Sequence, residues 1–198
     1  MGVSSLPNPT NQNLHHKLQE IVLHQSELMQ RLVYLQHICT EAYLCAGAIR
    51  NLVWALLHQQ HNSIGHGEID IVFFDPNEKN QQTCHEIEQK MTDKFPENEW
   101  DVVNQALVHT WYKTEMGNSI SPYTSLIDAL MTWPETATAV AIRLNQNNEI
   151  EIIAPFGLDD LFELKLRWNP RLVSHEVFMQ RVTSKRFLER WKNLKMLP

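Results

Sequence analysis

The stretch Glu68-Ile-Asp-Ile-Val-Phe-Phe-Asp75 decides the fold of this chain. Acidic and apolar residues alternate in its first half, and β-branched and aromatic residues follow, which is typical of a β-strand. Residues two apart in a strand point to the same face, so the carboxylates of Glu68 and Asp70 lie side by side. Such a pair repels itself unless a cation lies between the charges, and Mg²⁺ prefers oxygen ligands of this kind. The pair alone, however, is better explained as the solvent-facing edge of an amphipathic strand.

A glycine turn lies upstream of this strand. Gly47-Ala48-Ile49-Arg50-Asn51 follows a short apolar run over residues 41–46 and opens a predicted helix that extends to residue 59. The run predicts a short strand, and the apolar residues of the helix recur at helical spacing. Backbone N–H groups at a helix N-terminus bind phosphate, and the side chains of Arg50 and Asn51 could add donors. The simpler alternative is an ordinary strand-to-helix turn with a surface arginine.

The rest of the chain alternates between helical and strand-like patterns. The predicted helices span residues 14–38 (one or two helices), 78–95, 125–132, 158–164 and 175–194, and further strands span 100–105, 138–144 and 149–153. The last two strands flank an Asn-rich turn and predict a hairpin. This order favours an α+β (mixed α/β) fold with one central sheet. We expect a helical N-terminal extension over residues 1–40, a central domain over 41–170, and a C-terminal helix over 171–198 that packs on it.

A third carboxylate would complete a metal site, and two positions offer one. Asp101 lies on the predicted strand that follows Asp70 after one helix, whereas Glu151 lies on a strand after a longer excursion. The compact strand-helix-strand order favours Asp101. Asp75 lies an odd number of residues from Asp70 and faces the other side of a straight strand, so we interpret it as the cap of a turn.

Other polar side chains have less specific interpretations. His58, His61 and His66 fall in one polar segment, and a zinc site would need three or four ligands in fixed geometry, so a polar loop is the favoured interpretation. Arg143 either faces a triphosphate or pairs with a glutamate, Glu149 or Glu151, across the hairpin.

Two C-terminal features complete the pattern. Trp133-Pro134-Glu135 predicts a turn, which either shapes an acceptor pocket or is anchored by a buried tryptophan, the alternative that we favour. Basic residues are concentrated in the last predicted helix, at Lys185, Arg186, Arg190, Lys192 and Lys195. Basic side chains near a helix C-terminus interact favourably with the helix dipole, and we favour this interpretation over contact with RNA.

The composition is that of an ordinary globular protein, with 198 residues, 43% hydrophobic and 20% charged. A formal net charge of −6 argues against a broad nucleic-acid groove, which needs a basic face. Three widely spaced cysteines indicate reduced thiols. No apolar run reaches the roughly 20 residues of a membrane span, and the N-terminus does not resemble a secretory signal. These features predict a cytoplasmic protein.

The order of strand, glycine turn, helix, acid-x-acid strand and a further acid-bearing strand resembles the DNA polymerase beta-like nucleotidyltransferase superfamily. The likeness is closer to one bacterial nucleotidyltransferase-like group within it, often described only as nucleotidyltransferase family protein. Five segments resemble that group: Ala46–Trp54, Ile69–Asp75, Trp100–Ala106, Trp133–Val140 and Ala154–Leu161. The resemblance runs from about Tyr43 to the predicted C-terminal helix, so it covers most of the chain.

The resemblance implies a nucleotidyltransferase-like central mixed sheet with flanking helices. It also implies a metal-dependent enzyme that moves a nucleoside monophosphate from an NTP to an acceptor, with Mg²⁺ or Mn²⁺ as cofactor. The implied catalytic and metal-binding residues are Glu68, Asp70 and Asp101, and Asp101 alternatively acts as general base on the acceptor hydroxyl. The implied nucleotide-binding residues are Gly47, Ala48, Arg50 and Asn51.

Two departures from the pattern of this group keep an alternative open. Glu68 stands where an aspartate is expected, and Ala48 stands where glycine or serine is expected. The alternative is therefore a catalytically weak or inactive nucleotide-binding or regulatory module of the same fold. An RNA-end nucleotidyltransferase is less favoured because of the net negative charge. The expected partners are an NTP and a small-molecule or protein acceptor, without membrane or nucleic acid.

Overall fold

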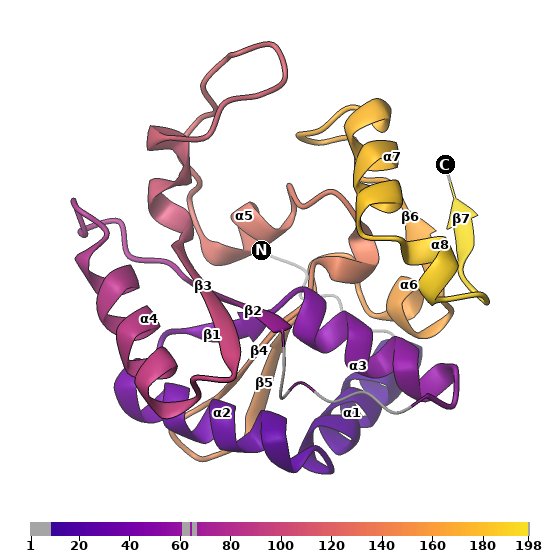
Figure 1. The fold of residues 1–198 in the computed structure, drawn as a ribbon, viewed down its shortest axis with the longest axis horizontal. Coiled ribbons are helices and arrows are strands. Elements are labelled where there is room, and N and C mark those ends of the chain that lie inside the picture. Colours follow the sequence, from indigo (N-terminus) through magenta and orange to yellow (C-terminus); the bar gives the residue numbers. More distant parts are fainter. Residues whose placement is uncertain (1–8, 61–63, 65–66, 198) are drawn as a thin grey trace, which may run out of the picture.

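A five-stranded mixed sheet forms the centre of the molecule in the computed structural model, which describes residues 9–60, 64 and 67–197 (Figure 1). Its strands are β1 (Tyr43–Cys45), β2 (Gly67–Phe73), β3 (Asn98–Asn104), β4 (Ala141–Leu144) and β5 (Ile150–Ile153). They lie in the order β3-β2-β1-β4-β5, with β2 and β3 parallel and the other neighbours antiparallel. The predicted mixed sheet and the predicted hairpin, β4-β5, are both confirmed.

Helices from the first half of the chain cover one face of this sheet. They are α1 (Pro9–Leu23), α2 (Ser26–Ile38), α3 (Gly47–Leu57) and α4 (Gln82–Lys94). The larger hydrophobic core lies between them and the sheet, and its sheet residues include Ile69, Ile71 and Phe73 of β2, none more than 2% exposed. The predicted helical segment over residues 14–38, for which one or two helices were expected, therefore forms parts of two helices that contribute to the core.

The other face of the sheet is covered only in part. The short 3₁₀ helix η1 (Gln105–Thr110) follows β3, and α5 (Leu126–Leu130) packs over a smaller core that contains Tyr43, Cys45 and Val72. Because side chains alternate along a strand, Glu68 and Asp70 share this second face with Val72. The alternation of β2 thus places its apolar residues in the main core and its acids on the open face.

The C-terminal part lies beside the sheet, at the right of Figure 1. It contains η2 (Thr136–Thr138), α6 (Asp159–Phe162), β6 (Lys165–Arg167), α7 (His175–Ser184), α8 (Phe187–Arg190) and β7 (Lys195–Leu197). β6 and β7 form a separate parallel pair. Among the described residues, no helix is long and apolar enough to cross a membrane.

The single helix predicted for residues 175–194 is wrong, because the chain breaks between α7 and α8. Arg186 adopts a left-handed backbone conformation (φ 53°) at the break. The resulting turn lets Phe187 and Trp191 pack edge-on against Trp54, at ring centroid distances of 5.9 and 6.2 Å. Burial of these rings outweighs the local helical preference. The division into residues 1–40, 41–170 and 171–198 stays a prediction.

Candidate active site

Two parallel strands present the three predicted acids. In the register of β2 and β3, Asp70 lies opposite Asp101, and Glu68 lies one pleat away on the same face as Asp70. Trp100 and Val102 point to the main core, so the alternation of β3 turns Asp101 to the open face. The sheet backbone therefore fixes the positions from which the three acidic side chains extend.

The three side chains converge. One carboxylate oxygen from each of Glu68, Asp70 and Asp101 lies within 4.8 Å of the others. Burial raises the pKa of Asp70, and the neighbouring charges of Glu68 and Asp101 raise it further. The pKa of Asp101 is also raised, by burial and then by the charges of Glu68 and Glu88. The cluster thus concentrates negative charge in a place where a cation would stabilise it.

The turn between β1 and α3 borders this cluster. The N–H of Gly47 donates a hydrogen bond to the Asp70 carboxylate, which opposes the rise of the Asp70 pKa. A Cβ atom on Gly47 would meet its nearest neighbour at 3.8 Å, so space alone does not require glycine there. The unusual backbone belongs instead to Ala46, with φ 52° and ψ −118°. That conformation suits glycine and costs about 1–3 kcal/mol for other residues.

Arg50 is a buried residue rather than a surface arginine. Its Nη1 donates to Thr138 Oγ1 at 3.0 Å and its Nη2 donates to Asn51 Oδ1 at 3.1 Å. The guanidinium also lies over the rings of Phe187 and Trp54, at 4.5 and 5.3 Å from their centroids. Burial lowers the pKa of Arg50 to about 10, although the charge of Glu135 opposes this shift. Arg50 stays a cation at neutral pH.

Three further cations come from the C-terminal helices, and the sequence interpretation missed their role. Arg181 Nε donates to Glu135 Oε1 at 2.6 Å, and Glu135 is fully buried. Lys185 Nζ lies 3.4 Å from Glu68 Oε2, at a pair that is about half exposed. Arg190 is exposed and stacks on Trp191. The cluster of basic residues in an otherwise acidic chain was the available signal.

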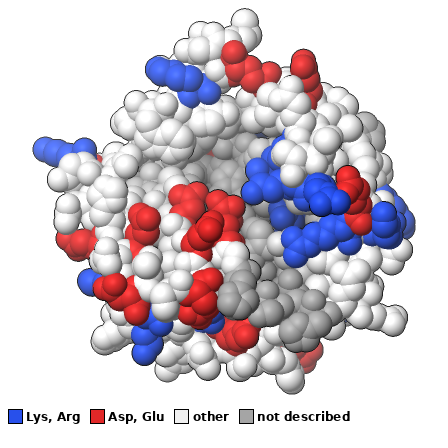
Figure 2. Space-filling model, in the orientation of Figure 1, with Lys and Arg blue, Asp and Glu red and all other residues white. Residues whose placement is uncertain are grey.

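The acids and the cations face one another across a cleft of about 530 Å³. Its lining includes the glycine turn, the three acids, Arg50, Asn51, Arg181, Lys185 and Arg190. Figure 2 shows a hollow with acidic side chains on one side and basic side chains on the other. The favoured interpretation of the C-terminal cations, as partners of a helix dipole alone, is therefore incomplete.

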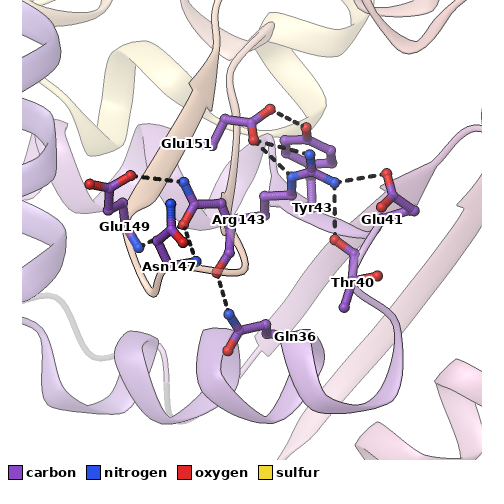
Figure 3. Close-up of polar contacts among 9 residues, drawn as sticks. Gln36, Thr40, Glu41, Tyr43, Arg143, Asn147, Glu149 and Glu151 are labelled. Atoms are coloured by element: carbon purple, nitrogen blue, oxygen red, sulfur yellow. Dashed lines mark hydrogen bonds and ion pairs between the residues drawn. The ribbon is translucent and has the colours of Figure 1, made fainter.

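Glu151, the rival third acid, lies elsewhere. It accepts hydrogen bonds from Tyr43 Oη at 2.6 Å and from the Arg143 guanidinium at 3.0 and 3.1 Å (Figure 3). Arg143 Nη1 also pairs with Glu41 Oε2 at 2.9 Å. Hydrogen bonds from both partners and the charge of Arg143 lower the pKa of Glu151 against the effect of burial. Of the two alternatives for Arg143, pairing across the hairpin is the one observed, with Glu151, and both residues are engaged in this network.

Three other predicted positions have clear outcomes. Asp75 Oδ1 accepts from the N–H of Asn77 at 2.9 Å, so the predicted turn cap is confirmed. Trp133 is only partly buried and lines the cleft, which contradicts the favoured interpretation of a buried anchor. His58 packs against Trp191, whereas His61 and His66 lie outside the described residues.

Comparisons with known proteins agree with this geometry. A family model described as "Nucleotidyltransferase" matches residues 36–196. A solved structure described as a CCA-adding enzyme head domain is 27% identical and superposes with a TM-score of 0.77, with 99% of each chain covered. None of the curated proteins matches the sequence.

Larger enzymes share the fold. An apo CCA-adding enzyme (TM-score 0.56) and the Thermotoga maritima CCA-adding enzyme complexed with tRNA (TM-score 0.55) are each 15% identical to this chain. In both, 91% of this chain is covered, but only 44% and 42% of the larger chains. The present chain therefore spans less than half of their length.

Proposed function

Because this chain belongs to the nucleotidyltransferase family whose model matches most of its length, we propose that it transfers a nucleoside monophosphate from an NTP to the hydroxyl group of a small-molecule or protein acceptor. The observation that supports this proposal best is the convergence of Glu68, Asp70 and Asp101 at one wall of a cleft whose other wall is basic. Opposite charges facing each other suit a substrate that arrives as a polyanion with a metal ion.

The donor set fits a hard divalent cation. Each of the three side chains offers a carboxylate oxygen, and Mg²⁺ and Mn²⁺ favour oxygen ligands. Glu68, Asp70 and Asp101 would hold the ion. When bound, such an ion neutralises charge on the phosphates and stabilises the oxygen atoms that enter and leave at phosphorus.

The basic wall is suited to the triphosphate. Arg181 is anchored by Glu135 and is therefore already oriented, and Lys185 and Arg190 extend from α7–α8 on flexible stems. Arg50 adds a buried cation behind them. Because Gly47 N–H is already bonded to Asp70, the next amide of the turn, that of Ala48, is the better candidate for a phosphate contact. The side chain of Asn51 lines the cleft beside it.

The residues also supply a route for the proton. The acceptor hydroxyl oxygen forms a new bond to the α-phosphorus, and the bond from that phosphorus to the bridging oxygen breaks, with its electron pair leaving on pyrophosphate. The hydroxyl proton passes to the carboxylate of Asp101 and then to solvent. In this step Asp101 serves as the general base, which is the alternative to its role as a ligand of the ion.

Net charge supports a small-molecule or protein acceptor over RNA. The larger structural neighbours include an enzyme complexed with tRNA, but this chain carries a net charge of −6 and covers less than half of those enzymes. A long RNA would need cations well beyond the cleft.

Titration of the full chain with ATP, CTP, GTP and UTP, each with and without Mg²⁺ or Mn²⁺, tests the proposal by thermal shift. At least one NTP should stabilise the protein in a metal-dependent way. Asp70→Asn should abolish the stabilisation and lower transfer of labelled NMP by about 100-fold or more, since a metal ligand contributes several kcal/mol. Asp93→Asn, on the exposed surface of α4, is the matched control and should behave as wild type.

The outcomes separate the alternatives. Failure of every NTP to bind at millimolar concentration overturns the proposal. Metal-dependent binding without any labelled product, from a cell extract as acceptor source, identifies the inactive binding module instead.

A further inference from the structure

A second cavity of about 250 Å³ opens on the other side of the acids. Asp70, Asp101, Trp133 and Pro134 line both this cavity and the basic cleft, so the two spaces meet at the carboxylates. Two ligands, one bound in each cavity, would therefore come closest to each other at Asp70 and Asp101.

Aromatic rings form much of the wall of the second cavity. Trp111 and Tyr112 follow η1, and their ring centroids lie 6.2 Å apart in an edge-on arrangement. Tyr123 lies in the segment before α5, and its hydroxyl is bonded to Thr132 Oγ1 at 2.8 Å. Such rings bind planar groups by stacking and edge contacts. Trp111 is 52% exposed although it is large and apolar, which suits a side chain that a ligand covers.

The charges of the two cavities differ. Arg50, Arg181, Lys185 and Arg190 line the cleft, whereas the described residues that line the second cavity include no lysine or arginine. Its charged members are Asp70 and Asp101, and its other polar groups are neutral hydroxyls and the Gln105 amide. A phosphorylated ligand would find no counter-charge here and would be repelled by the acids.

On the basis of the proposed function, we propose that the second cavity binds the acceptor, and that the acceptor is an uncharged group that contains an aromatic ring and a hydroxyl. The ring lies against Trp111 and Tyr123, and the hydroxyl points to Asp70 and Asp101. The volume corresponds to about eight water molecules, which is enough for one or two rings. The hydroxyl forms the bond to the α-phosphorus as pyrophosphate leaves, and its proton passes to Asp101.

Two sources can supply such a ring, a free small molecule or a tyrosine side chain. The test therefore uses the full chain, loaded with Mg²⁺ and a non-hydrolysable analogue of the NTP that binds best. Calorimetry then measures how tightly this complex binds each of five ligands. These are adenosine, N-acetyl-tyrosinamide, a tyrosine-containing peptide, adenosine 5′-monophosphate and a single-stranded RNA oligonucleotide. We expect at least one of the uncharged ring compounds to bind more tightly than the phosphorylated ligands.

Variants locate the binding. Trp111→Ala should weaken binding of the ring compound about five- to tenfold, the range expected for loss of one aromatic contact. Met116→Ala, at a position that is 86% exposed and outside the cavity, is the matched control and should change it less than twofold. Tyr123→Phe keeps the ring and should have an intermediate or small effect. All three variants should bind the NTP analogue as wild type does.

Three results would overturn the inference. These are tighter binding of RNA or the monophosphate than of every uncharged ring compound, no binding of any ring compound, and equal effects of Trp111→Ala and Met116→Ala. As long as the NTP analogue binds with metal, each of these results leaves the proposed nucleotidyl transfer intact, although tighter binding of RNA would overturn the small-molecule or protein acceptor proposed for it. Loss of NTP binding itself would refute the proposed function. A peptide that binds more tightly than N-acetyl-tyrosinamide identifies a protein acceptor.

Discussion

The two walls of the cleft differ in how their charges are held. Glu68, Asp70 and Asp101 project from adjacent hydrogen-bonded strands, whose register fixes their spacing. Among the facing cations, Arg181, Lys185 and Arg190 project on long side chains from α7, α8 and the turn between them, and of these three Arg181 is anchored by the buried Glu135. Rigid backbone thus assembles like charges that repel, whereas flexible side chains supply the opposite charges. The difference implies that variants in the two walls affect stability with opposite signs.

The largest effect on stability is expected from the anchored cation. Arg181→Met removes the one hydrogen-bond and ion-pair partner that the described residues give the buried Glu135 carboxylate, so that the charge of Arg50 is its remaining counter-charge. Breaking a buried pair costs about 3–5 kcal/mol, and the partial exposure of Arg181 reduces this to about 2–3 kcal/mol. Urea unfolding would measure the loss.

Two comparisons check that interpretation. The double variant with Glu135→Gln should recover most of the loss, because both charges are then removed. Arg190→Met, an exposed cation of the same wall, should cost under about 1 kcal/mol. Equal losses for Arg181→Met and Arg190→Met would contradict the distinction between anchored and free cations.

The opposite sign is expected from the acidic wall. Asp70 and Asp101 have raised pKa values in the folded protein because of burial and neighbouring acids, so the folded state binds protons more readily than the unfolded state. Their contribution to stability is fully present below the unfolded pKa of about 3.9 and is lost as pH rises through the raised folded pKa. Without metal, Asp70→Asn should therefore raise the melting temperature at pH 7.

The pH dependence gives a sharper measurement. The advantage of Asp70→Asn over wild type, measured in EDTA, should shrink as pH is lowered from 7 towards 4. Added Mg²⁺ should stabilise wild type and not the variant. A variant that is less stable than wild type at pH 7 in EDTA would show that repulsion among the acids is already compensated.

The sequence predicts the features of the two walls that depend on residues close together in the chain, and it does not predict those that depend on distant residues. The acids were predictable because alternation along β2 and the strand-helix-strand order are local patterns. A pairing of Arg143 with Glu149 or Glu151 was one of two alternatives for the same reason, and the register of the hairpin selects Glu151. The place of Asp101 beside Asp70 followed from the same short connection.

The basic wall depends on contacts that no local pattern contains. Lys185 meets Glu68 because Phe187 and Trp191 pack on Trp54 and break the last helix in two. Arg181 meets Glu135 across the turn that follows Trp133. The periodicity of the sequence does not reveal these long-range contacts. The segment that was predicted as one continuous basic helix therefore forms one wall of the cleft instead.

A smaller effect is expected at the glycine turn, where the sequence drew attention to Gly47 but the strained backbone is that of Ala46. Ala46→Gly should relieve the strain and stabilise the fold by about 1 kcal/mol after the entropy cost of glycine. Ala48→Gly, two residues on in a helical position, should destabilise it by about 1 kcal/mol. Chemical unfolding of both variants provides the test, and the same sign for both would refute the assignment of strain to Ala46.

The smallest effect concerns Lys185, which joins the two walls directly. Its ammonium lies 3.4 Å from Glu68 Oε2, so it partly neutralises the acids and must give way when Glu68 binds a cation. An exposed pair of this kind contributes about 0.2–1 kcal/mol, so Lys185→Met should tighten binding of Mn²⁺ alone by up to about fivefold. Lys192→Met, an exposed lysine beyond α8, is the control and should not change it.

The same variant should have the reverse effect on the nucleotide, because Lys185 also lines the space assigned to the triphosphate. In the presence of saturating Mn²⁺, Lys185→Met should bind NTP more weakly than wild type, and both effects should fade as salt screens the charges. Tighter binding of Mn²⁺ together with weaker binding of NTP would show that Lys185 pairs with Glu68 in the absence of metal and contacts the nucleotide in its presence. Shifts of the same sign would mean that Lys185 only adjusts the overall charge of the cleft.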